Sequence, residues 1–197
     1  MGPADEADFF AKQPALSFNL QTGEWLVVWE GSQVLPVENE IYGQFLGYTS
    51  GGLLTEKGRD DFRISDMGAD RYPSYYASAP QVEYDPGKEK YLVVWYGCDD
   101  WGEFDSCEDE IFGQLVGGKT RAEVGYNDFP LSEMGPKGDG DYSARYPALA
   151  FSIKSKNFLI TWQANDDRSS IGEDEIEIFG QRYATNLPLF LPLTINK

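Results

Sequence analysis

The sequence contains no histidine, which removes the most common general base and the most common transition-metal ligand of proteins. Catalytic Ser-His-Asp and Cys-His arrangements are therefore excluded. Basic residues are also scarce: 16 lysines and arginines stand against 33 aspartates and glutamates, a net charge of −17. Such an acidic surface repels nucleic acid and anionic membranes, so neither is expected as a partner. No stretch approaches the roughly 18 apolar residues of a membrane span, so membrane insertion is not expected.

Only two cysteines are present, Cys98 and Cys107, and they lie nine positions apart. A structural zinc site needs four cysteine or histidine ligands, so it is excluded. The short spacing favours a local disulfide over two free thiols, and a disulfide indicates a location outside a reducing cytosol. We therefore expect an extracellular or cell-surface protein. The N-terminus has neither the basic region nor the apolar run of a secretory signal peptide, so an exported form is expected to be mature or a fragment.

What the sequence does contain is one pattern written three times. A pentapeptide that ends in tryptophan recurs at residues 25–29, 91–95 and 158–162, and its tryptophans are 66 and 67 residues apart. Each copy is rich in β-branched and aromatic residues and predicts a short strand. Alternate residues of a strand point to opposite faces, and here both faces are apolar. This strand therefore needs cover on both sides, which is typical of stacked sheets.

Three further strand patterns recur in the same order around the pentapeptide. One precedes it, one that reads Glu-Ile-Tyr/Phe-Gly-Gln follows it, and a half-exposed one ends the repeat. Prolines in later copies of the last pattern confine it to a sheet edge, because proline cannot donate to the ladder. The residues concerned are 15–18, 81–84 and 148–151 before the pentapeptide, then 40–44, 110–114 and 177–181, and finally 61–65, 128–132 and 191–194.

These patterns predict an all-β, propeller-like fold with three four-stranded antiparallel blades of about 66 residues. The blades are expected at about 1–66, 67–133 and 134–197, and together they form one domain. A β-sandwich is the alternative, but it does not require this period. A glycine inside the Gln-ending strand predicts a bulge or a close backbone approach. Its glutamine is expected to bond within its own blade or, as the alternative, between neighbouring sheets.

Long acidic loops join the tryptophan strand to the next strand in the second and third repeats. Calcium is bound by six to eight oxygens, which closely spaced carboxylates and loop carbonyls supply. Both loops are therefore candidate calcium sites, although neither has EF-hand spacing, and the alternative is exposed charge on a long loop. The candidate ligands are Asp99, Asp100, Asp105, Glu108, Asp109, Asp166, Asp167, Glu173 and Asp174.

With its YLVVW and EIFGQ motifs and the NDF and MG sequences that follow, the chain resembles tandem propeller-like repeats in large secreted or surface proteins of bacteria and archaea. Some of those repeats look like integrin-α or FG-GAP propellers. The resemblance covers the whole chain. It implies a propeller fold and a location outside the cell, but no defined activity, and the acidic loops do not match the FG-GAP calcium pattern.

We predict a non-enzymatic, structural or adhesive extracellular module that acts through self-assembly. Three blades cannot close a ring, so each end blade is expected to keep an apolar face that marks an interface with another copy. Head-to-tail contacts of this kind give a ring or a filament. The last strand is unusually apolar and could add to a neighbouring chain's sheet. Its alternating assembly residues are Leu187, Leu189, Leu191, Leu193 and Ile195.

Two alternatives stay open. The first is a surface module that binds glycans or proteins and is a fragment of a larger propeller. Aromatic side chains that could stack on sugars are Trp101, Tyr72, Tyr75 and Tyr76. The second is a glycoside-processing enzyme, because paired carboxylates can perform that chemistry without histidine.

Overall fold

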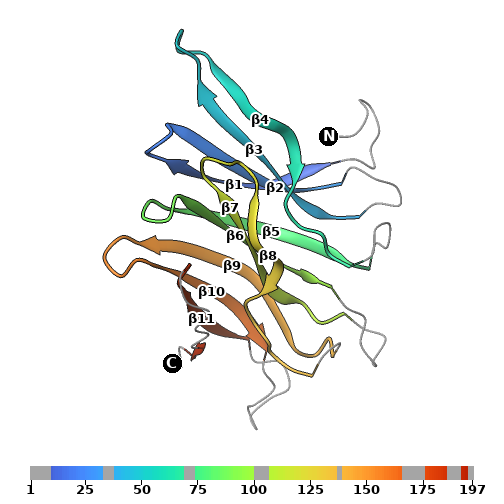
Figure 1. Ribbon diagram of the computed structural model, residues 1–197. Coiled ribbons are helices and arrows are strands. Elements are labelled where there is room, and N and C mark those ends of the chain that lie inside the picture. The colour runs from blue at the N-terminus through green and yellow to red at the C-terminus, as the bar shows by residue number, and fades with distance from the viewer. Residues whose placement is uncertain are drawn as a thin grey trace.

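The computed structural model describes residues 10–32, 38–68, 74–99, 107–136, 139–165, 176–185 and 192–194. The strands of these residues form three four-stranded antiparallel sheets (Figure 1). The predicted all-β, propeller-like fold is confirmed. The described part of the chain contains no helix that could cross a membrane.

Each sheet is one blade, and its strands follow one another in chain order. Blade 1 consists of β1 (Ala11–Asn19), β2 (Glu24–Gly31), β3 (Glu40–Tyr48) and β4 (Leu54–Arg63). Blade 2 consists of β5 (Tyr76–Asp85), β6 (Lys90–Cys98), β7 (Glu110–Gly117) and β8 (Glu123–Pro130). Blade 3 consists of β9 (Ser143–Ser152), β10 (Asn157–Asn165), β11 (Glu177–Tyr183) and β12 (Pro192–Thr194). The repeat boundaries near residues 66 and 133 stay predictions.

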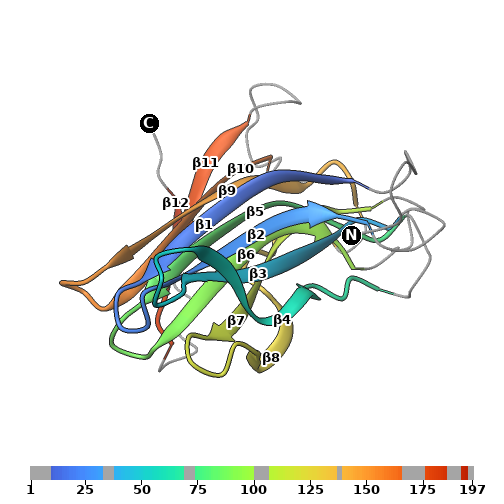
Figure 2. The ribbon, with the colours of Figure 1, turned by 90° about the horizontal axis from the view of Figure 1, so that it is seen from above.

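The blades stack face to face, with their first strands side by side. Strand β5 contacts β1, β2 and β3 of blade 1, and β9 contacts β5, β6 and β7 of blade 2. Figure 2 shows β1, β5 and β9 grouped on one side of the molecule and β4 and β8 on the opposite side. The first strands therefore form the axial side of the propeller-like stack.

The tryptophan strand of blade 2 is buried on both faces, as its sequence predicts. Tyr91, Val93 and Trp95 belong to the core between blades 1 and 2, whereas Leu92 and Val94 belong to the core between blades 2 and 3. In blade 1 only the face of Leu26 and Val28 is covered, by blade 2. The two faces of the tryptophan strand thus contact the two neighbouring blades. In blade 1, which has one described neighbour, one face of the strand makes this contact.

Both end faces carry exposed apolar side chains, as the sequence predicts. Blade 1 presents an aromatic cluster, in which the ring centroids of Phe18 and Tyr48 lie 4.5 and 5.7 Å from that of Trp25. The open face of blade 3 carries the exposed Leu159 and Ile178 together with Arg182, the partner of Leu159 on β11. Self-association through these faces stays a prediction.

One of the predicted assembly residues falls within the described chain. Leu193 lies in β12, which pairs with β11 of its own blade. The others, Leu187, Leu189, Leu191 and Ile195, lie outside the described residues.

The glycine and glutamine of the third strand act within their own blade. The ladder to the fourth strand shifts register beside Gly113, so the predicted bulge is confirmed, and a Cβ there would lie only 2.9 Å from Leu131 Cδ1. The backbone N–H of Asp128 donates to Gln114 Oε1 over 3.1 Å, and that of Asp61 donates to Gln44 Oε1 over 2.8 Å. In these two blades the glutamine therefore fastens the fourth strand and does not bridge sheets.

The glutamate of the same motif holds the connection to the next blade. Glu40 accepts hydrogen bonds from the Ser65 hydroxyl and from the Met67 amide, the latter over 2.9 Å. Glu110 accepts the equivalent bonds from Ser132 and, over 2.6 Å, from the Met134 amide. Because the arrangement recurs, these glutamates have a structural role.

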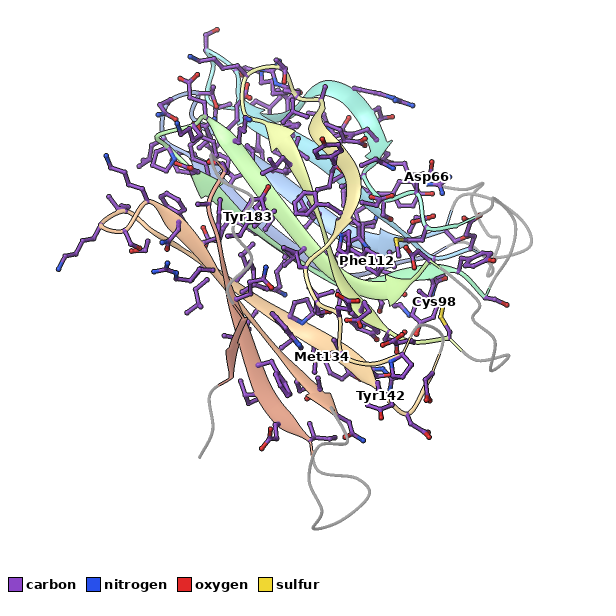
Figure 3. All side chains as sticks on the ribbon, turned by 60° about the horizontal axis from the view of Figure 1, so that its bottom comes forward. Asp66, Cys98, Phe112, Met134, Tyr142 and Tyr183 are labelled. Atoms are coloured by element: carbon purple, nitrogen blue, oxygen red, sulfur yellow. A yellow bond between two sulfur atoms is a disulfide. The ribbon has the colours of Figure 1, made fainter. Side chains whose placement is uncertain are left out.

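The predicted disulfide between Cys98 and Cys107 is confirmed (Figure 3), and it joins Cα atoms 5.9 Å apart. Replacing both cysteines by serine should lower the free energy of unfolding by about 2–3 kcal/mol, because the short cross-link restricts the unfolded chain. Urea unfolding of the variant and of the oxidised wild type measures this difference. Wild-type protein kept under reductant is the control and should match the variant. Equal midpoints for all three samples would contradict the prediction.

Candidate functional site

The first strand of every blade is kinked at the same position. The residue before a proline has a positive φ in all three blades: 54° at Gln13, 52° at Ala79 and 55° at Tyr146. The ladder to the second strand shifts register at each of these kinks. Positive φ is uncommon for residues other than glycine, and bulges of this kind redirect side chains, often beside functional sites.

Next to the kinks, the three blades carry different side chains on the same backbone. The residues just before the kink each pair with the residue that follows the motif tryptophan. The pairs are Lys12 with Glu30, Ser78 with Tyr96, and Arg145 with Gln163. Residues that build the blades recur in all three repeats, so positions where the repeats differ indicate a role other than folding.

The first carboxylate of this region lies between blades 1 and 2. Glu30 is 1% exposed and ion-pairs with Lys12 Nζ over 2.9 Å. It also accepts hydrogen bonds from Asn39 Nδ2 over 3.0 Å and from Ser78 Oγ of β5 over 2.6 Å. The carboxylate thus joins the first strands of two blades.

The second carboxylate lies between blades 2 and 3, at the repeat position that Asn39 holds in blade 1. Asp109 is fully buried and accepts hydrogen bonds from the Tyr76 hydroxyl of β5 and from Arg145 Nε of β9. The bond to Asp109 and the burial of the ring, which is the larger cause, raise the pKa of Tyr76 well above its usual range. Tyr76 therefore stays protonated and acts as a donor.

Tyr96 connects the surroundings of the two carboxylates. Its hydroxyl is hydrogen-bonded to Ser78, and its ring centroid lies 6.3 Å from that of Tyr76 and 5.4 Å from that of Tyr146. Burial, and then the nearby Tyr146, Asp109 and Glu30, raise the pKa of Tyr96. We call the whole group the axial cluster: Lys12, Glu30, Tyr76, Ser78, Tyr96, Asp109, Arg145 and Tyr146.

A ligand reaches the axial cluster through its cations and one aromatic ring. The side chains of Lys12 and Arg145 are 51% and 47% exposed, and Tyr146 is 56% exposed. Each buried carboxylate lies directly behind one of the two cations. The arrangement offers fixed hydrogen-bond donors and an apolar ring surface, backed by two carboxylates.

The predicted calcium ligands are not brought together in the part of the chain that the structure describes. Asp109 belongs to the axial cluster, Glu108 accepts a hydrogen bond from the Gly135 amide over 3.1 Å, and Asp99 follows β6. No group of three metal-binding side chains occurs among the described residues. The other candidates, Asp100, Asp105, Asp166, Asp167, Glu173 and Asp174, lie outside them. Calcium binding stays a prediction.

The aromatic residues predicted to contact sugars have different surroundings. Tyr76 belongs to the axial cluster, whereas the ring of Tyr75 covers Gly68 in the connection between blades. Trp101 and Tyr72 lie outside the described residues. Sequence reasoning missed the other members of the cluster. The signal that could have revealed them is the difference between aligned repeats at positions 12, 78 and 145 and at their partners.

No protein-family profile and no curated protein matches the sequence. The structure is similar to an N-acetylgalactosamine deacetylase from F. plautii, solved with blood group B trisaccharide, with a TM-score of 0.57 and 10% identity over 92% of this chain and 51% of that one. It is also similar to a family 117 glycoside hydrolase of the marine bacterium Zobellia galactanivorans, with a TM-score of 0.60 and 11% identity over 99% of this chain and 59% of that one. The chain thus spans little more than half the length of these solved chains.

These likenesses support the propeller-like fold and correct two predictions made from the sequence. Both solved proteins are carbohydrate-processing enzymes, which contradicts the predictions of a non-enzymatic module and of a protein that is not an enzyme. The sequence-based interpretation failed because it weighed the repeated residues, which build the blades, and gave no weight to the residues that differ. The resemblance to surface-protein repeats and integrin-α propellers stays a prediction.

Proposed function

We propose that the chain is part of a propeller enzyme that processes glycosides and that the axial cluster is its site. The observation that carries this proposal is that the side chains beside the kinks differ among the three repeats. Three blades with the same kinked backbone bring different polar and aromatic side chains to one place. Ser78 is bonded to Glu30 and Tyr76 to Asp109, and the rings of Tyr76 and Tyr96 are in contact. The likeness of the fold to two carbohydrate-processing enzymes supports it.

Glu30 and Asp109 are suited to cleavage of a glycosidic bond. This reaction uses one carboxyl group to protonate the leaving oxygen and a second as base or nucleophile. The two carboxylates are bonded to side chains of the same strand, Glu30 to Ser78 and Asp109 to Tyr76 of β5. Substrate reaches Glu30 when the half-exposed side chain of Lys12 changes rotamer, a common event on binding, whereas Arg145 keeps its bond to Asp109.

The exposed members of the axial cluster suit a sugar. The ring of Tyr146 offers an apolar surface to the face of a pyranose, and Lys12 and Arg145 donate hydrogen bonds to its hydroxyl groups. Glycans are therefore the partners that we propose. The disulfide supports a location outside the reducing cytosol.

Glu30→Gln and Asp109→Asn should each lower the rate of glycoside cleavage at least about 100-fold, because a neutral amide cannot act as an acid or a base. Release of reducing ends from a panel of oligosaccharides measures this rate for the full chain. Glu83→Gln is the matched control, since it removes a carboxylate from β5 outside the cluster. The proposal fails if no oligosaccharide is cleaved, or if all three variants lose activity equally.

A further inference from the structure

A small pocket of about 200 Å³ opens beside the axial cluster at the end of blade 3. Its size suits a single sugar ring, because pockets for larger ligands start at roughly 300 Å³. Strands β9 and β10 and the residues that flank β9 and β11 supply its walls. The lining includes Gly140, Ser143, Arg145, Gln163, Asn165 and Ile176.

The guanidinium group of Arg145 lines this pocket and offers hydrogen-bond donors to a ligand. Its Nε is bound to Asp109, which fixes the guanidinium group. Within the described residues, neither of its terminal nitrogens has a hydrogen-bond or ion-pair partner, and the amide of Gln163 has none either. The terminal edge of a guanidinium offers two parallel N–H groups that match a carboxylate or sulfate group.

The rest of the described lining complements this donor edge. It contains no aspartate or glutamate that would repel an anion. Ile176 is 63% exposed and provides an apolar edge against which a ring can pack. Ser143 adds a hydroxyl group that already donates to the Gly140 carbonyl and so presents its lone pairs.

Building on the proposed function, we propose that this pocket is the subsite for an anionic sugar residue, whose acidic group pairs with Arg145. The acidic group is either the carboxylate of a uronic acid or a sulfate ester, since both fit the guanidinium edge. Gln163 donates to a neighbouring hydroxyl, and the glycan continues from this subsite to the axial cluster. The proposal makes Arg145 a residue that determines specificity and Asp109 the group that positions it.

The test compares three oligosaccharides of equal length: a uronide, a sulfated one and a neutral one. Calorimetric titration of the full chain should show at least about tenfold tighter binding of one anionic ligand than of the neutral one, as expected for a charge-assisted hydrogen bond. The tighter of the two anionic ligands identifies the acidic group. Gln163→Glu should abolish this preference, because it places a carboxylate in the pocket without touching the bond between Arg145 and Asp109.

Arg145→Gln should also abolish the preference, and the Gln163 variant keeps the test valid if that protein does not fold. Lys154→Gln is the control, since it makes the same change in net charge at the exposed turn before β10. Equal binding of the three ligands by wild type, with cleavage of neutral glycans intact, would overturn the subsite and leave the proposed function standing. An equal loss in Lys154→Gln and Gln163→Glu would also overturn it. No binding of any glycan would overturn both.

Discussion

Replacing Trp95 by alanine is expected to lower the free energy of unfolding by about 4 kcal/mol, because removing a buried tryptophan leaves a cavity among packed neighbours. Trp95 has no exposed surface and belongs to the core between blades 1 and 2, with Leu26, Ile41 and Phe45 of the first repeat. Its loss therefore weakens the contact between two blades. Urea unfolding followed by far-ultraviolet circular dichroism measures the change.

The repeat supplies the control for this experiment. Trp29 is the equivalent residue of blade 1, but it lies half-buried on the face that no described blade covers. Trp29→Ala should cost about 1–2 kcal/mol, since less apolar surface returns to water. If the two variants lost the same stability, both tryptophans would be equally enclosed. That result would contradict the position of Trp29 on an outer face of the stack of blades.

The sequence predicts the blades well because their formation depends on short-range patterns. Side chains of a strand alternate between its two faces, so a strand that is apolar throughout requires cover on both faces. In blade 2 both Leu92 and Val93, which point to opposite faces, are buried. The glycine of the third strand is equally readable, since Gly113 leaves room for Leu131 of its own blade. Residue types that recur at the same position in all three repeats can therefore be assigned a structural role from the sequence.

The candidate site was not predictable in the same way, because it depends on which blade faces which. Glu30 and Ser78 are 48 positions apart, and the packing of β5 against β2 makes them neighbours. The kink that redirects Arg145 arises from a positive φ at Tyr146, a conformation that the sequence Tyr-Pro does not announce. The density of carboxylates in the acidic loops predicted calcium ligands, among them Asp109. In the structure Asp109 is bonded to an arginine and a tyrosine.

Thermal stability is expected to fall as the pH rises from about 5 to about 8. Burial, opposed by the nearby Arg63, raises the pKa of Glu40 from 4.5 to about 7. Burial, opposed by the bonds from Ser132 and Met134, raises the pKa of Glu110 from 4.5 to about 8. Between the unfolded and folded values the native state holds protons that the unfolded chain has released, so the free energy of unfolding decreases with pH. This contribution is complete below pH 4.5 and lost above pH 8.

For Glu40, which is 1% exposed, the shift corresponds to about 3 kcal/mol. Burial also raises the pKa of Asp128 to about 7, which adds to the loss of stability as the pH rises. The chain also becomes more negative as the pH rises, and the repulsion among its charges lowers stability in the same direction. Melting temperatures from calorimetry between pH 5 and pH 9 measure the sum. A melting temperature that rises with pH would contradict the prediction, because it requires carboxyl groups with lowered pKa values in the folded state.

A single substitution separates the buried glutamates from the general charge effect. Glu110→Gln keeps a carbonyl oxygen for the Met134 amide and places its NH2 group at the Ser132 hydroxyl, which can accept a hydrogen bond. The variant carries no charge, so it should raise the melting temperature at pH 8.5 and flatten the slope above pH 6. Glu56→Gln removes the same charge from an exposed position on β4 and should leave the slope as it is. If both variants flatten the slope equally, repulsion across the acidic surface causes the pH dependence. If only Glu110→Gln does, the burial of a carboxyl group in the connection between blades sets it.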